Sequence, residues 1–201
     1  MASIHNIVRA KLNLLPNGLK QLHGYTPGAS KTQPLTLRPF REDDLDDFYG
    51  WAGDDAVTCF MTWETFPNIE SARQFLMTVI IPHPWFRAIC INDKAVGHVL
   101  LKQGAGSHSC RAELGYAVSR NYWGVGIATE AVMRAVQAGF SELPGLRRIQ
   151  AIVLPENLPS QKVVEKAGFT RECLLRRYIK IRENVRDCIL YSYVLPAASS
   201  S

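Results

Sequence analysis

The sequence contains no run of about eighteen apolar residues, the length that an α-helix needs to cross a bilayer. We therefore expect no membrane-spanning segment. Cysteine pairs with Cys-x-x-Cys spacing are also absent, and the five cysteines are odd in number and scattered. This pattern provides neither a zinc knuckle nor a disulfide framework, and it favours a reducing, cytoplasmic compartment. Because His83, His98 and His108 lack ligand spacing, we expect no metal.

Acidic residues are missing from the first 41 positions, which hold six of the 23 lysines and arginines. Taking those six away leaves 17 bases against 18 acids, so the net charge of +5 resides in the N-terminal part. A nucleic-acid partner is therefore not expected. Elsewhere, residues 42–70 carry nine acids and no base, and residues 147–186 carry ten bases and four acids. The first run could attract a cationic acceptor and the second could attract phosphates, although either could be an ordinary solvated face.

The two ends of the chain differ in composition from its centre. Residues 1–34 are predicted to be an extension, since they lack acids and contain turn residues before Pro34. Such a segment could be an organelle-targeting presequence, but arginine is sparse, and a disordered or loosely docked tail is the simpler interpretation. Residues 196–201 are small and polar, and are predicted to be a flexible tail. One domain over residues 35–195 remains, long enough to bury a single core.

Hydrophobic periodicity predicts an α/β order of strand, two helices, three strands, helix, strand, helix and two strands. The first helix is expected to begin with an acidic turn at residues 42–44. The second is expected to begin at Ser71, which has capping-box spacing to Gln74. The two later helices are expected over residues 127–140 and 160–167. The predicted strands cover residues 35–39, 85–91, 95–102, 112–118, 148–154, 170–178 and 186–195.

A glycine turn separates the strand that ends at Val118 from the helix that begins at Ile127. Such a turn brings together unpaired backbone N–H groups and the positive end of a helix dipole, which bind phosphate without a charged side chain. Gly124 and Gly126 permit left-handed dihedrals and a close approach of the ligand. Taken alone, Gly-x-Gly before a helix is also a common structural turn.

Residues 113–131, ELGYAVSRNYWGVGIATEA, resemble the acetyl-coenzyme A loop of the GNAT superfamily of N-acetyltransferases. The family motif Gln/Arg-x-x-Gly-x-Gly/Ala maps onto residues 123–128, where Trp123 stands in place of Gln or Arg. Residues 157–169, NLPSQKVVEKAGF, resemble a second motif in the branch that includes the bacterial ribosomal-protein N-acetyltransferases. The resemblance covers residues 35–195. Two motifs in the family's order and at its distance make it specific.

The resemblance implies a fold and a cofactor. The fold is a single α/β domain with a mixed, mostly antiparallel sheet of about seven strands, splayed around a cleft, and about four flanking helices. The cofactor is acetyl-CoA, whose pantetheine arm would lie between residues 116–118 and 148–153 and hydrogen-bond like an added strand. The residues implied to bind it are Tyr116, Ala117, Val118, Trp123, Gly124, Val125, Gly126, Ile127, Ala128, Thr129 and Asn157.

The implied reaction is direct attack of a primary amine on the thioester, in a monomer or a homodimer. We expect Glu113 to be the base, because apolar neighbours on its strand could bury it and raise its pKa; a solvent-facing strand residue is the alternative. Asn157 and Ser160 complete the implied catalytic set, although both could be helix-cap residues. Many relatives have a tyrosine as general acid where this chain has Val164. Trp63 lies in a loop that borders the acceptor site in this family.

The acceptor implied by the branch is the α-amine of a protein or peptide. The same chemistry on a small amine, such as a polyamine, amino sugar or amino acid, is a close alternative. A non-catalytic sensor of acyl-CoA is a third possibility.

Overall fold

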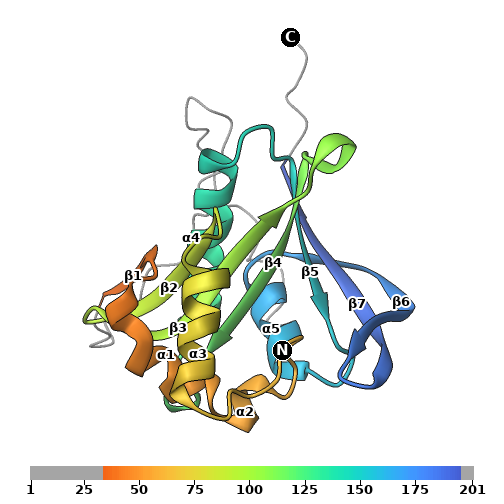
Figure 1. Cartoon of the computed structure of the whole chain (residues 1–201). Helices are drawn as coiled ribbons and strands as arrows, with labels where there is room; N and C mark the ends of the chain where they lie inside the picture. The colour runs from red at the N-terminus through yellow and green to blue at the C-terminus, as the bar shows by residue number, and fades with distance from the viewer. Residues whose placement is uncertain (1–33, 196–201) are drawn as a thin grey trace, which may run out of the picture. The chain divides into compact units, whose positions relative to one another are not determined.

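Residues 34–195 are described by a computed structural model, in which seven strands form one sheet in the order β1-β2-β3-β4-β5-β7-β6 (Figure 1). All neighbouring strands are antiparallel except β4 and β5, which are parallel. The expected mixed, mostly antiparallel sheet is therefore confirmed. The strands are β1 (Leu35–Pro39), β2 (Phe86–Ile91), β3 (Lys94–Gln103), β4 (Arg111–Val118), β5 (Arg148–Val153), β6 (Thr170–Ile181) and β7 (Asn184–Val194). The extension and tail predicted at 1–34 and 196–201 lie outside the described residues, apart from Pro34.

Five α-helices accompany the sheet in this part of the chain, one more than predicted. They are α1 (Leu45–Ala52), α2 (Asp55–Thr58), α3 (Ile69–Phe75), α4 (Ile127–Glu142) and α5 (Leu158–Lys166), and a π-helical turn, η2 (Leu76–Ile80), continues α3. The additional helix, α2, is a single turn and is too short to show a hydrophobic period. Asp54 caps it by accepting a hydrogen bond from the amide of Ala56. None of the helices within residues 34–195 is long and apolar enough to cross a bilayer.

Two helices begin earlier than predicted, for the same reason. The capping box predicted from Ser71 to Gln74 is wrong, because Asn68 caps α3 and its Oδ1 accepts from the amide of Ser71 at 2.9 Å. In the same way, Asn157 caps α5 by accepting from the amide of Ser160 at 3.1 Å. Ser160 is therefore inside the helix and is not its cap. An asparagine three residues before a serine satisfies the free amides that the serine hydroxyl was expected to satisfy.

The helices cover the two faces of the sheet separately, with α1 and α3 in front and α4 and α5 behind (Figure 1). The rear core joins β-strand residues such as Val99, Leu114 and Ile149 to Val132 of α4 and Val164 of α5. The front core is rich in aromatic side chains, and its main members are Phe48, Trp51, Leu76, Ile80 and Phe86. The front face of β5, β6 and β7 lies beyond these helices and holds only a small cluster of Leu154, Ile181 and Cys188.

The C-terminal hairpin is longer than predicted. Its strands pair as far as Ile181 and Asn184, around a two-residue turn in which Arg182 has a φ of 53°. A bulge interrupts the register between Leu175 and Ile179, and the amide of Arg177 in this bulge donates to Asp187 Oδ1 at 2.7 Å. The bulge breaks the alternation of side chains between the two faces of the sheet. The strand predicted from that alternation therefore ended at residue 178, three residues before β6 itself ends.

Candidate active site

The parallel strands β4 and β5 diverge along their length. They pair from Arg111 with Arg148 to Leu114 with Ala151, and no register pair follows. Figure 1 shows the two strands close together at their beginnings and far apart at their ends. From Gly115 onward, β4 is therefore paired only with β3 on its other side. This matches the splayed sheet expected around residues 116–118 and 148–153, and it leaves backbone hydrogen-bonding groups free on the edge that faces β5.

The glycine turn lies at the end of β4 and leads into α4. Gly124 and Gly126 have φ values of 77° and 89°, in the left-handed region that favours glycine. A Cβ added at either position would meet no atom of residues 34–195 within 4 Å, so in this part of the chain nothing fills the space in front of the turn. The first amides of α4 have no carbonyl one turn earlier to bond, and Gly126 caps the helix without a side chain. The turn therefore combines free amides, an open approach and the positive end of a 16-residue helix.

A cavity of about 490 Å³ lies against this turn and is called the loop cavity here. Trp123 holds the turn to the strand end, because its Nε1–H donates to the carbonyl oxygen of Val118 at 2.6 Å. Val125 is the one residue predicted in the turn that does not line the cavity, and it is 62% exposed. The predicted residues that do line it are Tyr116, Ala117, Val118, Trp123, Gly124, Gly126, Ile127, Ala128, Thr129, Asn157 and Ser160.

Two lysines of the loop cavity were missed by the sequence reasoning. Lys162 and Lys166 line it from α5, both are exposed, and neither forms an ion pair within residues 34–195. Their spacing of four residues places them on one face of a helix, and this was a signal available in the sequence. Together with the amides of α4 they make this wall of the cavity electropositive.

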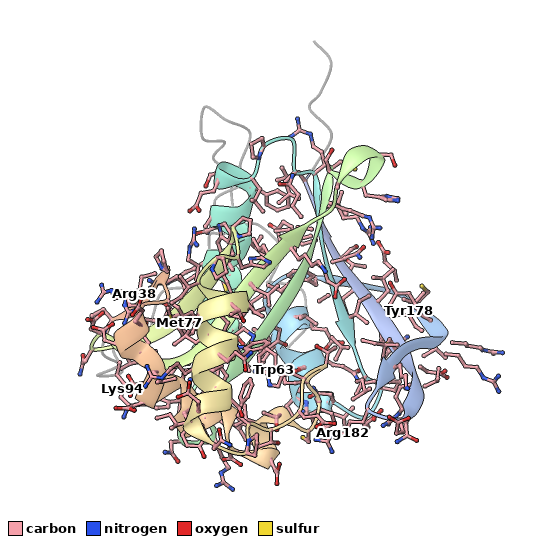
Figure 2. The ribbon with its side chains drawn as sticks, viewed as in Figure 1. Arg38, Trp63, Met77, Lys94, Tyr178 and Arg182 are labelled. Atoms are coloured by element: carbon pink, nitrogen blue, oxygen red, sulfur yellow. The ribbon has the colours of Figure 1, made fainter. Side chains whose placement is uncertain are left out.

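A second cavity, of about 390 Å³, adjoins the first and is called the sheet cavity here. The two cavities meet near the end of β4 and the beginning of α5, because five residues line both: Phe60, Met61, Tyr116, Asn157 and Ser160. The sheet cavity lies on the front face, where its walls come from the segment between α2 and α3, from β3 to β5, and from the β6–β7 hairpin. Figure 2 labels Trp63 on that segment, in front of the sheet.

Comparison with known proteins agrees with this geometry. Residues 34–170 match the family described as the Acetyltransferase (GNAT) domain. An uncharacterized N-acetyltransferase, p20, of Bacillus licheniformis is 33% identical over 166 residues, which covers 80% of this chain and 93% of p20. The chain belongs to the GNAT acetyltransferase family. The resemblance deduced from the two motifs is thereby confirmed, and the protein is an acyltransferase.

Two solved GNAT structures illustrate the range of the family. RimJ of Mycobacterium smegmatis, in complex with CoA-disulfide, is 26% identical, with a TM-score of 0.68 over 84% of this chain and 86% of RimJ. Spermidine N-acetyltransferase of Vibrio cholerae, in complex with CoA and spermine, is 20% identical, with a TM-score of 0.68 over 80% of this chain and 95% of that protein. At that identity the second comparison supports the GNAT fold alone.

Glu113 lies in the sheet cavity of this GNAT domain, but it is not buried. The predicted burial between Ala112 and Leu114 is wrong. Successive side chains of a strand point to opposite faces, so the two apolar neighbours enter the rear core while Glu113 faces the open front face. Lys102 is its register partner on β3 and lines the same cavity.

Tyr116 joins β4 to the start of α5 at the meeting point of the two cavities. Its hydroxyl donates to the carbonyl oxygen of Ser160 at 3.0 Å, and burial raises its pKa to about 12. Val164, at the position of the missing tyrosine, is fully buried in the rear core and faces neither cavity. The hydroxyl groups at the meeting point therefore come from Tyr116 and Ser160.

Proposed function

We propose that this GNAT enzyme transfers acetyl from acetyl-CoA to the α-amine of a protein or peptide, by direct attack in a ternary complex. The observation that carries the proposal is the junction of the two cavities at the splayed ends of β4 and β5. One cavity has the features of a diphosphate site, and the other has room for an amine beside a carboxylate. A thioester held at the junction would be within reach of both.

The loop cavity fits acetyl-CoA. Amides at the beginning of α4 would hold the diphosphate, Gly124 and Gly126 leave room for it, and Lys162 and Lys166 add positive charge. The free edge of β4 from Gly115 to Val118 would hydrogen-bond the pantetheine arm. An amide near Val118 would then polarise the thioester carbonyl, and such a donor lowers a barrier by about 3–4 kcal/mol. Acetyl-CoA would supply the activated acetyl group, and CoA would leave as the thiolate.

Glu113 is the residue we assign to proton removal. An amine attacks only when neutral, and α-amines, with a pKa near 8, lose a proton more readily than lysine side chains. Because Glu113 is exposed within the sheet cavity, it would act through a water molecule rather than by direct contact with a buried amine.

No strong general acid is needed at the other end of the reaction. A thiol has a pKa of about 8.5, whereas the pKa of Tyr116 is raised to about 12, so the phenol would not protonate a thiolate. Ser160 would instead donate a hydrogen bond to the leaving sulfur. Tyr116, whose one O–H is donated to the carbonyl oxygen of Ser160, and Asn157, which caps α5, would hold Ser160 in place. The thiolate can leave as such and take its proton from water.

The charge of the sheet cavity favours a peptide over a polyamine as acceptor. Its walls, as far as residues 34–195 form them, hold one acid, Glu113, and one base, Lys102, so a polycation would find no excess of negative charge there. None of the nine acids of residues 42–70 lines this cavity. Several of their carboxylates are already engaged: Asp44 with Arg38, Asp47 with Lys94, and Asp54 with Arg120. A small amine that carries no further positive charge, such as an amino sugar, is the remaining alternative as acceptor.

The test is release of free thiol from acetyl-CoA with peptides that begin with Ala, Ser, Thr or Met, compared with spermidine and an amino sugar. We expect turnover with at least one peptide, and Glu113→Gln should lower kcat by about a hundredfold without changing the affinity for CoA. Glu70→Gln, which alters an exposed acid at the start of α3, is the control. Thermal stabilisation by CoA without turnover of any amine would contradict the proposal and favour a sensor. An unchanged pH profile in Glu113→Gln would remove this residue from the mechanism.

A further inference from the structure

Two buried polar atoms in the wall of the sheet cavity have no hydrogen-bond partner within residues 34–195. They are Nε1 of Trp63 and Nδ1 of His98, on residues that both line the cavity. The two rings are neighbours, with centroids 5.3 Å apart. A buried donor or acceptor without a partner is costly and uncommon in folded proteins. Two of them on adjacent rings, beside a cavity, therefore call for an explanation.

The other three tryptophans show that the fold otherwise satisfies indole N–H groups. Trp51 donates to the carbonyl oxygen of Ala95 at 3.2 Å, Trp85 donates to Glu142 at 2.8 Å, and Trp123 donates to the carbonyl oxygen of Val118 at 2.6 Å. Trp63 is thus the single exception among the four tryptophans of the chain, and it is the one that lines the sheet cavity.

His98 is held in place as a neutral ring. It is 1% exposed and lies against Trp51, Trp63 and Phe86, with ring centroids 4.9–5.5 Å away. Burial lowers its pKa to about 3, so at neutral pH the ring carries one N–H donor and one acceptor nitrogen. The charged residues that line the same cavity are Lys102 and Glu113. His98 therefore offers hydrogen bonding without charge.

We infer that Trp63 and His98 form a polar subsite that binds an uncharged oxygen-bearing group, a carboxamide or a hydroxyl, on the acceptor amine. The inference rests on the proposed function and narrows its substrate class. An indole N–H needs an oxygen or nitrogen lone pair, and a carboxamide or hydroxyl can at the same time exchange a hydrogen bond with the imidazole. The first carbonyl of a peptide acceptor is such a group. An alkylammonium chain has only donors and would leave Trp63 Nε1 unpaired.

The test compares two acceptors of similar shape, alaninamide and 1,2-dimethylpropylamine, which differ in whether a carboxamide or an isopropyl group follows the amine-bearing carbon. The ratio of their kcat/KM values is measured in the wild type and in Trp63→Phe, so that the different amine pKa values cancel. Trp63→Phe keeps an aromatic ring and removes the N–H. We expect it to reduce the preference for alaninamide about tenfold or more, because a site built for a polar group discriminates against its absence.

Variants of His98 separate a polar role from packing. His98→Phe should reduce the same preference, and His98→Asn should restore part of it, because its amide can occupy the place of Nδ1. Trp51→Phe is the matched control, since it alters the same aromatic cluster through an indole that is already paired and does not line the sheet cavity. It should lower the melting temperature and leave the acceptor preference unchanged.

A second measurement does not depend on turnover. The indole N–H signal of Trp63, identified in ¹⁵N-labelled CoA-bound protein by its loss in Trp63→Phe, should shift with alaninamide and not with 1,2-dimethylpropylamine. If the signal shifts while no amine is acetylated, the subsite stands and the proposed enzyme activity fails. If both amines shift the signal equally, or if amines are acetylated and the Trp63→Phe ratio is unchanged, the inference is overturned.

Discussion

At the scale of single residues, backbone conformation matters as much as side-chain chemistry. Gly126 caps α4 in a left-handed conformation and faces open space, so no neighbouring side chain among the described residues fixes its identity. Gly145 has the same kind of conformation, with a φ of 71°, and its missing Cβ also faces open space, but it does not line the loop cavity. The two glycines therefore share a backbone conformation, and they differ in that Gly126 lines the loop cavity and Gly145 does not.

The substitution Gly126→Val should weaken the binding of CoA by about tenfold or more, which corresponds to about 1.4 kcal/mol. A branched side chain would occupy the space in front of the α4 amides and disfavour the left-handed backbone. Isothermal titration calorimetry measures the change. Gly145→Val carries a similar backbone penalty and should lower the melting temperature without altering affinity. Equal affinity in Gly126→Val and the wild type would count against the assignment of the loop.

At the scale of elements, Asn157 has two separable tasks. It caps α5, and it lies where the loop cavity and the sheet cavity meet. A cap contributes about 1 kcal/mol, whichever residue supplies the oxygen. A contact with substrate would instead depend on the amide group itself.

Asn157→Ala should therefore lower the melting temperature by about 2–4 °C, through loss of the cap. Asn157→Asp keeps an acceptor oxygen at the beginning of α5 and should retain the melting temperature. If Asn157 also contacts acetyl-CoA, as the resemblance to the family implies, the aspartate variant should still bind CoA less well than the wild type. Differential scanning fluorimetry and calorimetry on the same samples distinguish the two tasks. A stable aspartate variant with normal affinity would limit Asn157 to capping.

The elements also show where sequence reasoning succeeded and where it could not. Strands β1 to β5 and helix α4 followed the predicted periodicities, because their apolar residues repeat with the period of the element that buries them. The site residues of the turn could be located for a similar reason, since glycine spacing records a backbone conformation. The starts of α3 and α5 were predicted too late, and helix α2 was missed. In all three places a capping hydrogen bond, and not the hydrophobic period, determines where the helix begins.

The acceptor side was harder to predict, because it is built by tertiary contacts. Nothing local in the sequence indicates that Trp63 and His98 lie side by side. The exposure of Glu113, in contrast, follows from the predicted strand, whose alternation already places Ala112 and Leu114 on the opposite face. The acidic run suggested an open negative face, whereas partners distant in sequence, such as Lys94 and Arg120, pair with several of its carboxylates. Pairings over such separations are set by topology and do not appear in a local pattern.

At the scale of the whole molecule, the C-terminal half of the sheet is tied together by one charged cluster. Glu172 of β6 accepts hydrogen bonds from Arg148 of β5, at 2.8 and 2.6 Å, and from Ser192 of β7 at 2.5 Å. These bonds, chiefly those from Arg148, lower the pKa of Glu172 to about 2, from 4.5. The cluster therefore links the stability of three strands to the ionisation of one carboxyl group.

Because the pKa of Glu172 is lower in the folded protein, its stabilisation is complete above about pH 4.5 and is lost as the pH falls toward about 2. Glu172→Gln should lower the melting temperature at pH 7 by about 2–4 °C, a modest change because the pair is partly exposed. The difference from the wild type should shrink between pH 4.5 and 2. Thermal unfolding followed by circular dichroism over this range measures it. Glu183→Gln, in an exposed pair with Lys180, should show no difference at any pH.

Within residues 34–195, the four register pairs between β4 and β5 are the entire strand-to-strand connection between the first four strands and the last three. The pantetheine arm of acetyl-CoA, hydrogen-bonded along the free edge of β4, would add contacts in the gap between β4 and β5. Occupancy would then govern how often the sheet opens along this line, and with it the access of proteases to the centre of the molecule.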